Sequence, residues 1–277
     1  MRTSTNSERL HGMHTENPFL FYDLAPDVVA FSTNRHGGIS KGDYATFNVN
    51  AWCGDSPDNV RANREVLCKA LRLEKDRLVM PHQIHGTETR LIASEFFSLR
   101  DDVRQMLLEG VDAVITKETE VCIGVSTADC IPVLLYDAGS HACAAIHAGW
   151  RGTVARIVQR AIAEMKLAFG SEPQQLQAVI GPGISLEAFE VGQEVYDSFA
   201  EAGFCMDDIA RMYDKWHIDL PLCNRMQLME AGLREENIQT AAICTYQNHK
   251  DYFSARRLGV NSGRMLTGIM LRNTDKT

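Results

Sequence analysis

Short apolar segments that are typical of β-strands follow one another through much of this chain, without a helix regularly placed between them. A strict alternation of strands and helices would predict a doubly wound parallel sheet, and the order of segments does not match that pattern. The sequence therefore predicts an α+β fold, a single domain of mixed β-sheets layered with helices. The expected strands lie near residues 28–33, 77–80, 88–93, 112–116, 121–126, 132–136, 142–146, 177–181, 240–245 and 266–271.

The clearest helix signal lies at residues 154–169, where apolar side chains recur every three or four positions. Thr153 is expected to cap the start of this helix, and Gly170 is expected to end it. Three more helices are expected, at residues 57–73 after the cap Ser56, at 192–202, and at 221–232 after Asp219.

The composition excludes some partners. The 277 residues are 45% hydrophobic and carry a net charge of −8, so a duplex nucleic-acid partner is not expected, because phosphate backbones attract basic surfaces. A small anionic substrate is compatible with this charge, since it needs only a few local arginines. Residues 17–277 are expected to form one catalytic domain, after a polar leader at 1–16 that we expect to be disordered.

We expect the chain to work in the cytoplasm. Its N-terminus lacks the apolar stretch of a secretory signal, and no segment approaches the roughly 18 apolar residues of a membrane span. The eight cysteines form no C-x-x-C pair, and reduced thiols are expected for a chain of this length. The oligomeric state, monomer or homodimer, is left open.

Cys130 and His147 each lie at the edge of an apolar run, in S-T-A-D-C-I-P-V-L-L and in A-I-H-A-G-W-R-G-T. Adjacent antiparallel strands at 121–130 and 142–147 would bring the two side chains together. Taken singly, Cys130 could be a small buried hydrophobe and His147 a structural histidine. Together with His85 of P-H-Q-I-H-G, they could form a three-ligand zinc site with an open fourth position.

The chain contains several long and unusual sequence words: T-A-D-C-I-P-V-L-L, H-A-G-W-R-G-T, H-Q-I-H-G, I-G-P-G-I, F-S-A-R-R, T-N-R-H-G-G-I-S and G-D-S-P-D-N-V-R-A-N-R. With these words the chain resembles the YfiH/laccase-domain family, also described as polyphenol oxidase-like and as peptidoglycan editing factor. The resemblance extends from about residue 28 to residue 271. Two positions depart from the family pattern: Ala255 stands where F-S-x-R-R usually has an aromatic residue, and Ser262 begins the usual T-G-R.

This resemblance implies a Zn²⁺ site made of His85, Cys130 and His147, in which Cu²⁺ could replace zinc because copper binds N/S ligands more tightly. His82 falls where the family does not require a histidine, so we treat it as a neighbour. The implied fold is an assembly of mixed sheets similar to the cytotoxic-necrotising-factor deamidases. The implied reactions are phosphorolysis of purine nucleosides (inosine, adenosine, guanosine and methylthioadenosine) and deamination of adenosine, with laccase activity also associated with the family.

Deamination would use a zinc-bound water, which ionises near neutral pH and could attack the amino-bearing carbon of adenine. That reaction needs an acid/base partner, and Asp129 beside Cys130 is a candidate. The alternative role for Asp129 is to orient a loop or a ligand.

Phosphorolysis needs a phosphate held beside the ribose, and arginine side chains match phosphate oxygens well. The candidates in the shared sequence words are Arg35, Arg64 and Arg151, each of which could instead be a solvated charge. Asn48 and Gln83 could bind the ribose or order the loops.

Three other classes of function stay open. A cysteine hydrolase or amidase, as in peptidoglycan precursor editing, would use Cys130 as nucleophile and His147 as base. A copper phenol oxidase is disfavoured, because multicopper oxidases use many histidines, often in H-x-H pairs, and this chain has nine histidines and no such pair. A non-catalytic module that binds nucleotides or a metal is the last alternative.

Overall fold

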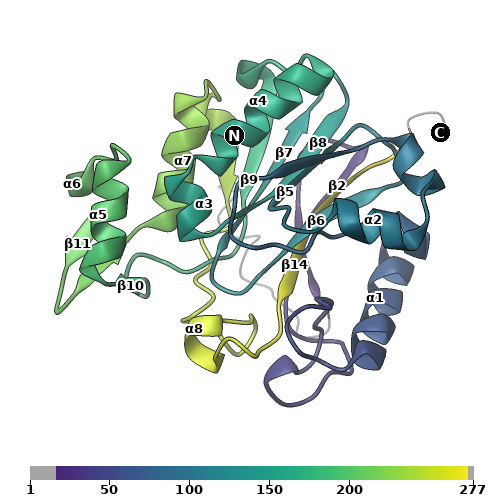
Figure 1. Cartoon of the computed structure of the whole chain (residues 1–277), viewed down its shortest axis with the longest axis horizontal. Coiled ribbons are helices and arrows are strands. Elements are labelled where there is room, and N and C mark those ends of the chain that lie inside the picture. The colour runs from purple at the N-terminus through teal and green to yellow at the C-terminus, as the bar shows by residue number, and fades with distance from the viewer. Residues whose placement is uncertain (1–16, 274–277) are drawn as a thin grey trace, which may run out of the picture.

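The computed structural model describes residues 17–273, so the leader expected to be disordered lies outside the described residues. Two large mixed β-sheets dominate the structure (Figure 1). The five-stranded sheet has the order β1 (Phe19–Tyr22), β2 (Val28–Thr33), β14 (Met265–Leu271), β6 (Cys122–Thr127) and β3 (Leu78–Val79). The six-stranded sheet has the order β13 (Ile238–Thr240), β9 (Leu176–Ile180), β7 (Ile131–Asp137), β8 (Ala142–Ala148), β5 (Ala113–Thr116) and β4 (Thr89–Ile92).

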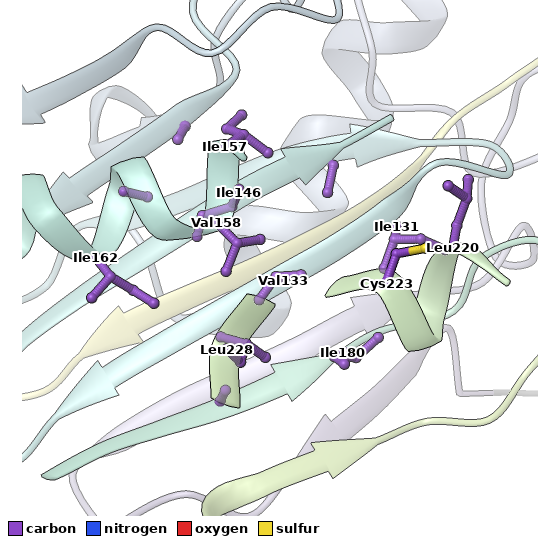
Figure 2. Close-up of a cluster of buried hydrophobic side chains, with 14 of the residues drawn as sticks. Ile131, Val133, Ile146, Ile157, Val158, Ile162, Ile180, Leu220, Cys223 and Leu228 are labelled. Carbon is purple, nitrogen blue, oxygen red and sulfur yellow. The ribbon is translucent and has the colours of Figure 1, made fainter. Parts of the chain in front are cut away.

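The two sheets pack face to face, and helices cover their outer faces. One buried cluster, which includes Val125 and Leu134, fills the space between the sheets. A second cluster lies between the six-stranded sheet and the helices α4 (Ile157–Phe169) and α7 (Leu220–Glu230), as Figure 2 shows. A third cluster joins the five-stranded sheet to α1 (Pro57–Leu71). The result is a four-layer α/β/β/α arrangement.

Strand β7 shows why the central strands are continuously apolar. Its side chains alternate between the two faces of the sheet. Val133 and Leu135 face the helices, whereas Leu134 and Tyr136 face the other sheet. Because both faces are buried, every position of the strand favours an apolar residue, which produces the run that the sequence displays.

The remaining elements are small. A three-stranded sheet of β10 (Glu190–Val191), β12 (Trp216–Ile218) and β11 (Ala210–Met212) lies with α5 (Gln193–Glu201) and α6 (Met206–Ile209) at one side of the molecule (Figure 1). The other helices are α2 (Asp101–Leu107), α3 (Trp150–Val154) and α8 (Ala255–Leu258). Within residues 17–273, no helix is both long and apolar enough to cross a bilayer.

The predicted α+β fold of mixed sheets is confirmed, with corrections at the level of elements. The helix expected at 154–169 is divided: α3 precedes it, and Arg156 adopts a left-handed backbone conformation (φ 63°) before α4 begins. Thr153 therefore lies inside α3 rather than capping α4. Gly170 ends α4 as expected, also in the left-handed region.

The strand expected at 240–245 is also misplaced. The observed strand β13 ends at Thr240, and Ala242 has a φ of 53°, which an extended strand does not accommodate. Asp219 caps α7 directly, because its side chain accepts a hydrogen bond from the N–H of Leu222 at 2.8 Å.

Candidate metal centre and cleft

Cys130 and His147 are brought together by the hairpin of β7 and β8. In this hairpin Pro132 is the cross-strand partner of His147, and Cys130 immediately precedes β7. The expected pairing of a strand at 121–130 with the segment at 142–147 is therefore wrong. Strand β6 ends at Thr127 and belongs to the other sheet, because the chain turns at Asp129, whose φ is 90°, and crosses between the sheets.

His85 reaches the same place from the loop that follows β3. Its backbone is left-handed (φ 66°), and its N–H donates to Asp112 Oδ1 at 3.0 Å. Single ligand atoms of His85, Cys130 and His147 lie within 4.8 Å of one another, and no other group of this kind is found among the described residues. The imidazole rings of the two histidines meet edge to face, with centroids 4.9 Å apart.

Asp112 belongs to the candidate site but was not predicted from the sequence. Its fully buried carboxylate accepts hydrogen bonds from His147 Nδ1 at 2.7 Å and from the backbone N–H groups of Ile84, His85 and Gly86. The sequence does mark this position, because a charged aspartate stands at the start of the otherwise apolar run 112–116. Since Nδ1 of His147 is occupied, its Nε2 is the nitrogen available to a metal.

The charges within the cluster support one another. Burial raises the pKa of the Cys130 thiol, but the neighbouring His147 and His85 outweigh this effect and lower that pKa to about 6. Burial lowers the pKa of His147, but Cys130 and the carboxylate of Asp112 raise it to about 9. A thiolate beside an imidazolium is therefore the favoured state at neutral pH in the metal-free protein.

Gly149 gives the cluster its space. A Cβ atom at this position would lie 2.9 Å from His85 Cδ2 and 3.2 Å from Cys130 Sγ. A larger residue would thus displace two of the three ligands.

The cluster opens into a cleft of about 930 Å³. Aromatic side chains line part of it, namely Trp52, Trp150 and Phe189. Two arginines also line it, Arg256 of α8 and Arg264 just before β14. Neither arginine was predicted from the sequence to line the site, although the word F-S-A-R-R includes Arg256. The reason is that the C-terminal segment reaches this site only through the pairing of β14 with β6.

None of the three arginines expected to bind phosphate lines the cleft. Arg35 donates to the carbonyl oxygens of Ala45 and His249, both at 2.7 Å. Arg64 donates to the carbonyl of Val49 at 2.8 Å, and its guanidinium lies 5.9 Å from the centroid of the ring of Trp52, a residue that does line the cleft. Arg151 is exposed and its guanidinium lies 4.2 Å from the centroid of the Trp150 ring.

The polar candidates mostly order loops. Asn48 is fully buried, and its side chain bonds to Asp55 and to the N–H of Arg264. Gln83 lines the cleft, and its side-chain amide makes three hydrogen bonds with Ser126. The amide nitrogen donates to the carbonyl of Ser126, and the amide oxygen accepts from the backbone N–H and the hydroxyl of Ser126.

Asp129 also lines the cleft, but both of its carboxylate oxygens are engaged. Oδ1 accepts from Thr245 Oγ1 and Oδ2 accepts from the N–H of Arg256, each at 2.7 Å. The carboxylate thus fixes the first turn of α8 above the cleft. Ala255 also lines the cleft, whereas Ser262 is buried and accepts a hydrogen bond from Arg264.

Known proteins resemble this chain in sequence and in fold. A purine nucleoside phosphorylase of Bacteroides thetaiotaomicron is 47% identical over 248 residues, which are 88% of this chain and 92% of that protein. Adenosine deaminase RL5, from an unknown prokaryotic organism, is 41% identical over 245 residues, 87% of this chain and 93% of that protein. The crystal structure of a hypothetical protein YfiH from Bacillus licheniformis matches with a TM-score of 0.85 at 25% identity, covering 94% of this chain and 98% of that one.

The expected family resemblance and the prediction of an enzyme are both confirmed by these relatives. The family model described as multi-copper polyphenol oxidoreductase laccase matches residues 29–272. This chain therefore belongs to the laccase-like family that includes the YfiH proteins.

Proposed function

We propose that this chain is a zinc-dependent enzyme that phosphorolyses purine nucleosides such as inosine, adenosine, guanosine and methylthioadenosine, giving the free base and ribose 1-phosphate. Deamination of adenosine is a side activity of the same site. The observation that carries the proposal is the His85–Cys130–His147 cluster, which opens into a cleft lined by two arginines. The printed names of the two relatives, a phosphorylase and a deaminase, support it.

The donor set fits zinc. One thiolate and two imidazoles are ligands that Zn²⁺ favours, and three protein ligands leave a position for water or substrate. When bound, zinc would supply a Lewis acid and lower the pKa of a bound water. His85, Cys130 and His147 would hold the ion, and Asp112 would orient His147 through Nδ1. Cu²⁺ would compete for the same ligands.

Phosphate is expected to bind Arg256 and Arg264 rather than the arginines first considered, because these two line the cleft. Each guanidinium already donates to backbone carbonyls, Arg256 to Glu190 and Arg264 to Val260, which fixes its position before substrate binds. Asp129 is assigned the orienting role, since its two oxygens hold Thr245 and the start of α8.

A second candidate is the cysteine hydrolase. The lowered pKa of Cys130 and the raised pKa of His147 are typical of a nucleophile–base pair. The two candidates differ in whether Cys130 is free to react: a zinc-bound thiolate resists alkylation by iodoacetamide. A multicopper oxidase is supported less, since one cluster of three ligands among residues 17–273 suits a single metal ion.

The test is a product assay with inosine and phosphate. Wild-type protein should form hypoxanthine and ribose 1-phosphate, and Cys130→Ala should lose both zinc and activity. Cys205→Ala is the matched control, because Cys205 is an exposed cysteine at the start of the distant helix α6. Full activity in Cys130→Ala, or in protein stripped of metal, would contradict the proposal. A cytoplasmic location is part of the proposal and is supported by eight free cysteines.

A further inference from the structure

His82 is held in the cleft by contacts from three sides. Its backbone N–H donates to the carbonyl of Leu108, and its own carbonyl accepts from the N–H of Gly110, both at 3.0 Å. Its ring Nδ1 lies 2.7 Å from Glu109 Oε1. Its ring stacks on Trp52, with centroids 5.1 Å apart and planes only 13° from parallel.

The second ring nitrogen of His82 is free. Among residues 17–273, Nε2 has no hydrogen-bond partner, and 34% of the side chain is exposed while the residue lines the cleft. A carboxylate on Nδ1 fixes the ring orientation and tautomer, which leaves Nε2 as the nitrogen that exchanges a proton with a ligand. The same pairing of carboxylate and imidazole orients general acids and bases in other enzymes.

The other ionisable groups of the cleft are less suited to donate a proton. His85, Cys130 and His147 form the metal cluster, and both oxygens of Asp129 are engaged. The guanidinium groups of Arg256 and Arg264 already donate to the backbone carbonyls of Glu190 and Val260. The thiol of Cys53 is directed to Asn48 and the carbonyl of Asn50, and burial, the largest effect on it, raises its pKa.

We propose that His82 is the general acid that protonates the departing purine, positioned by Glu109 and Trp52. This inference rests on the proposed phosphorolysis. As a phosphate oxygen bonds to C1′ of the ribose, the C1′–N9 bond breaks and its electron pair moves into the base. In its imidazolium form, with Nδ1–H donated to Glu109, His82 gives its Nε2 proton to N7, and the base leaves neutral. The monohydrogen phosphate that attacked gives up its proton after the bond forms, and this proton returns to His82, so the reaction balances.

The test compares inosine with 7-methylinosine. The methylated base carries a positive charge before the bond breaks and leaves as a neutral molecule, so it needs no proton from the enzyme. General acid catalysis contributes roughly 10²–10⁴-fold to rate. His82→Asn should therefore lower kcat for inosine by about 10²-fold or more, with a small change in KM, and leave kcat for 7-methylinosine within about threefold of wild type.

Controls separate this role from a structural one. His36→Asn is the matched variant, because Nε2 of His36 lies 2.9 Å from Asp251 in a similarly exposed pair outside the cleft lining. This variant should keep the wild-type kcat for both inosine and 7-methylinosine. Glu109→Gln, which keeps a hydrogen-bond acceptor for Nδ1, should give a smaller loss confined to inosine. All variants should keep the zinc content and melting temperature of the wild type.

Each outcome has a distinct meaning. If His82→Asn lowers kcat equally for both substrates, or does not lower kcat for inosine, the assignment of His82 is overturned while phosphorolysis itself stands. Wild-type protein that cleaves neither nucleoside in the presence of zinc and phosphate would instead overturn the proposed function. A loss restricted to inosine supports the assignment.

Discussion

Asp112 joins two parts of the candidate metal centre that are distant in the sequence. One carboxylate binds the ring of His147 and three consecutive backbone N–H groups of the loop that carries His85. Burial raises its pKa, but the hydrogen bond and charge of His147 and the backbone donors outweigh burial and lower that pKa below its ordinary value. The side chain thus stays ionised and aligns two ligands at once.

We expect Asp112→Asn to weaken zinc binding by about 10- to 100-fold, because a partner that orients a ligating histidine is lost. Competition with a chelating dye would measure the affinity. Asp137→Asn is the control, since Asp137 is an equally buried carboxylate in the turn at the opposite end of the β7–β8 hairpin. Equal zinc affinities in the two variants would contradict the orienting role of Asp112.

Zinc binding is also expected to release protons. In metal-free protein Cys130 has a pKa of about 6 and His147 of about 9, so between these values the thiolate is ready but the imidazolium must lose its proton to bind zinc. Affinity should therefore rise with pH through this window, level off above the pKa of His147, and fall more steeply below the pKa of Cys130. Calorimetry in buffers of different ionisation enthalpy measures the number of protons released when zinc binds. If no proton is released near neutral pH, the thiolate–imidazolium pair of Cys130 and His147 is contradicted.

At the scale of elements, α8 depends on a residue far away in the sequence. This helix has four residues, too few for stability on its own, and Asp129 accepts the N–H of Arg256 in its first turn. Because Arg256 is a proposed phosphate contact, the position of α8 links Asp129 to substrate binding.

Asp129→Asn should therefore raise KM for phosphate several-fold and change kcat little. The free energy of unfolding should fall by about 1–3 kcal/mol, the cost of weakening a buried charge-assisted hydrogen bond. Steady-state kinetics and hydrogen exchange of α8 would measure both effects. Thr245→Val, which removes only the bond at Oδ1, should show a smaller effect of the same kind. If Asp129 is instead an acid/base group, kcat falls and KM for phosphate does not change.

Long elements were predictable from the sequence, whereas short ones were predictable only in some places, as for the strands β3, β4 and β5. Strand β7 and helix α4 were evident because their burial pattern repeats over many residues. Strand β1 and the three-stranded sheet were missed, since two to four residues carry too little pattern. The same limit applies to the site: sequence words identified the three ligands, but only the tertiary pairing of β14 revealed Arg264 in the cleft.

At the scale of the whole molecule, the cluster lies where the chain passes between the two sheets. His85 is in the connection from β3 to β4, and Cys130 is in the connection from β6 to β7, both of which leave the five-stranded sheet for the six-stranded one. His147 is near the end of β8. An ion bound by all three would cross-link both connections to the six-stranded sheet.

Bound zinc should therefore stabilise the entire fold. At free zinc about a thousandfold above its dissociation constant, the expected gain is about 4 kcal/mol in the free energy of unfolding, provided the unfolded chain does not bind the ion. Thermal unfolding with and without a chelator would measure the shift in Tm. The Tm of Cys130→Ala should not change when the chelator is added. A similar shift in Tm for Cys130→Ala and wild type would mean that the stabilising ion binds elsewhere.

The most direct test of the central claim is a zinc titration of metal-free protein, followed by the rate of hypoxanthine formation from inosine and phosphate. Our account predicts that activity rises in proportion to added zinc and saturates at about one ion per chain, because three ligands with one open position make a single catalytic site. Full activity before any zinc is added, or activity that appears only when several copper ions are bound per chain, would contradict it.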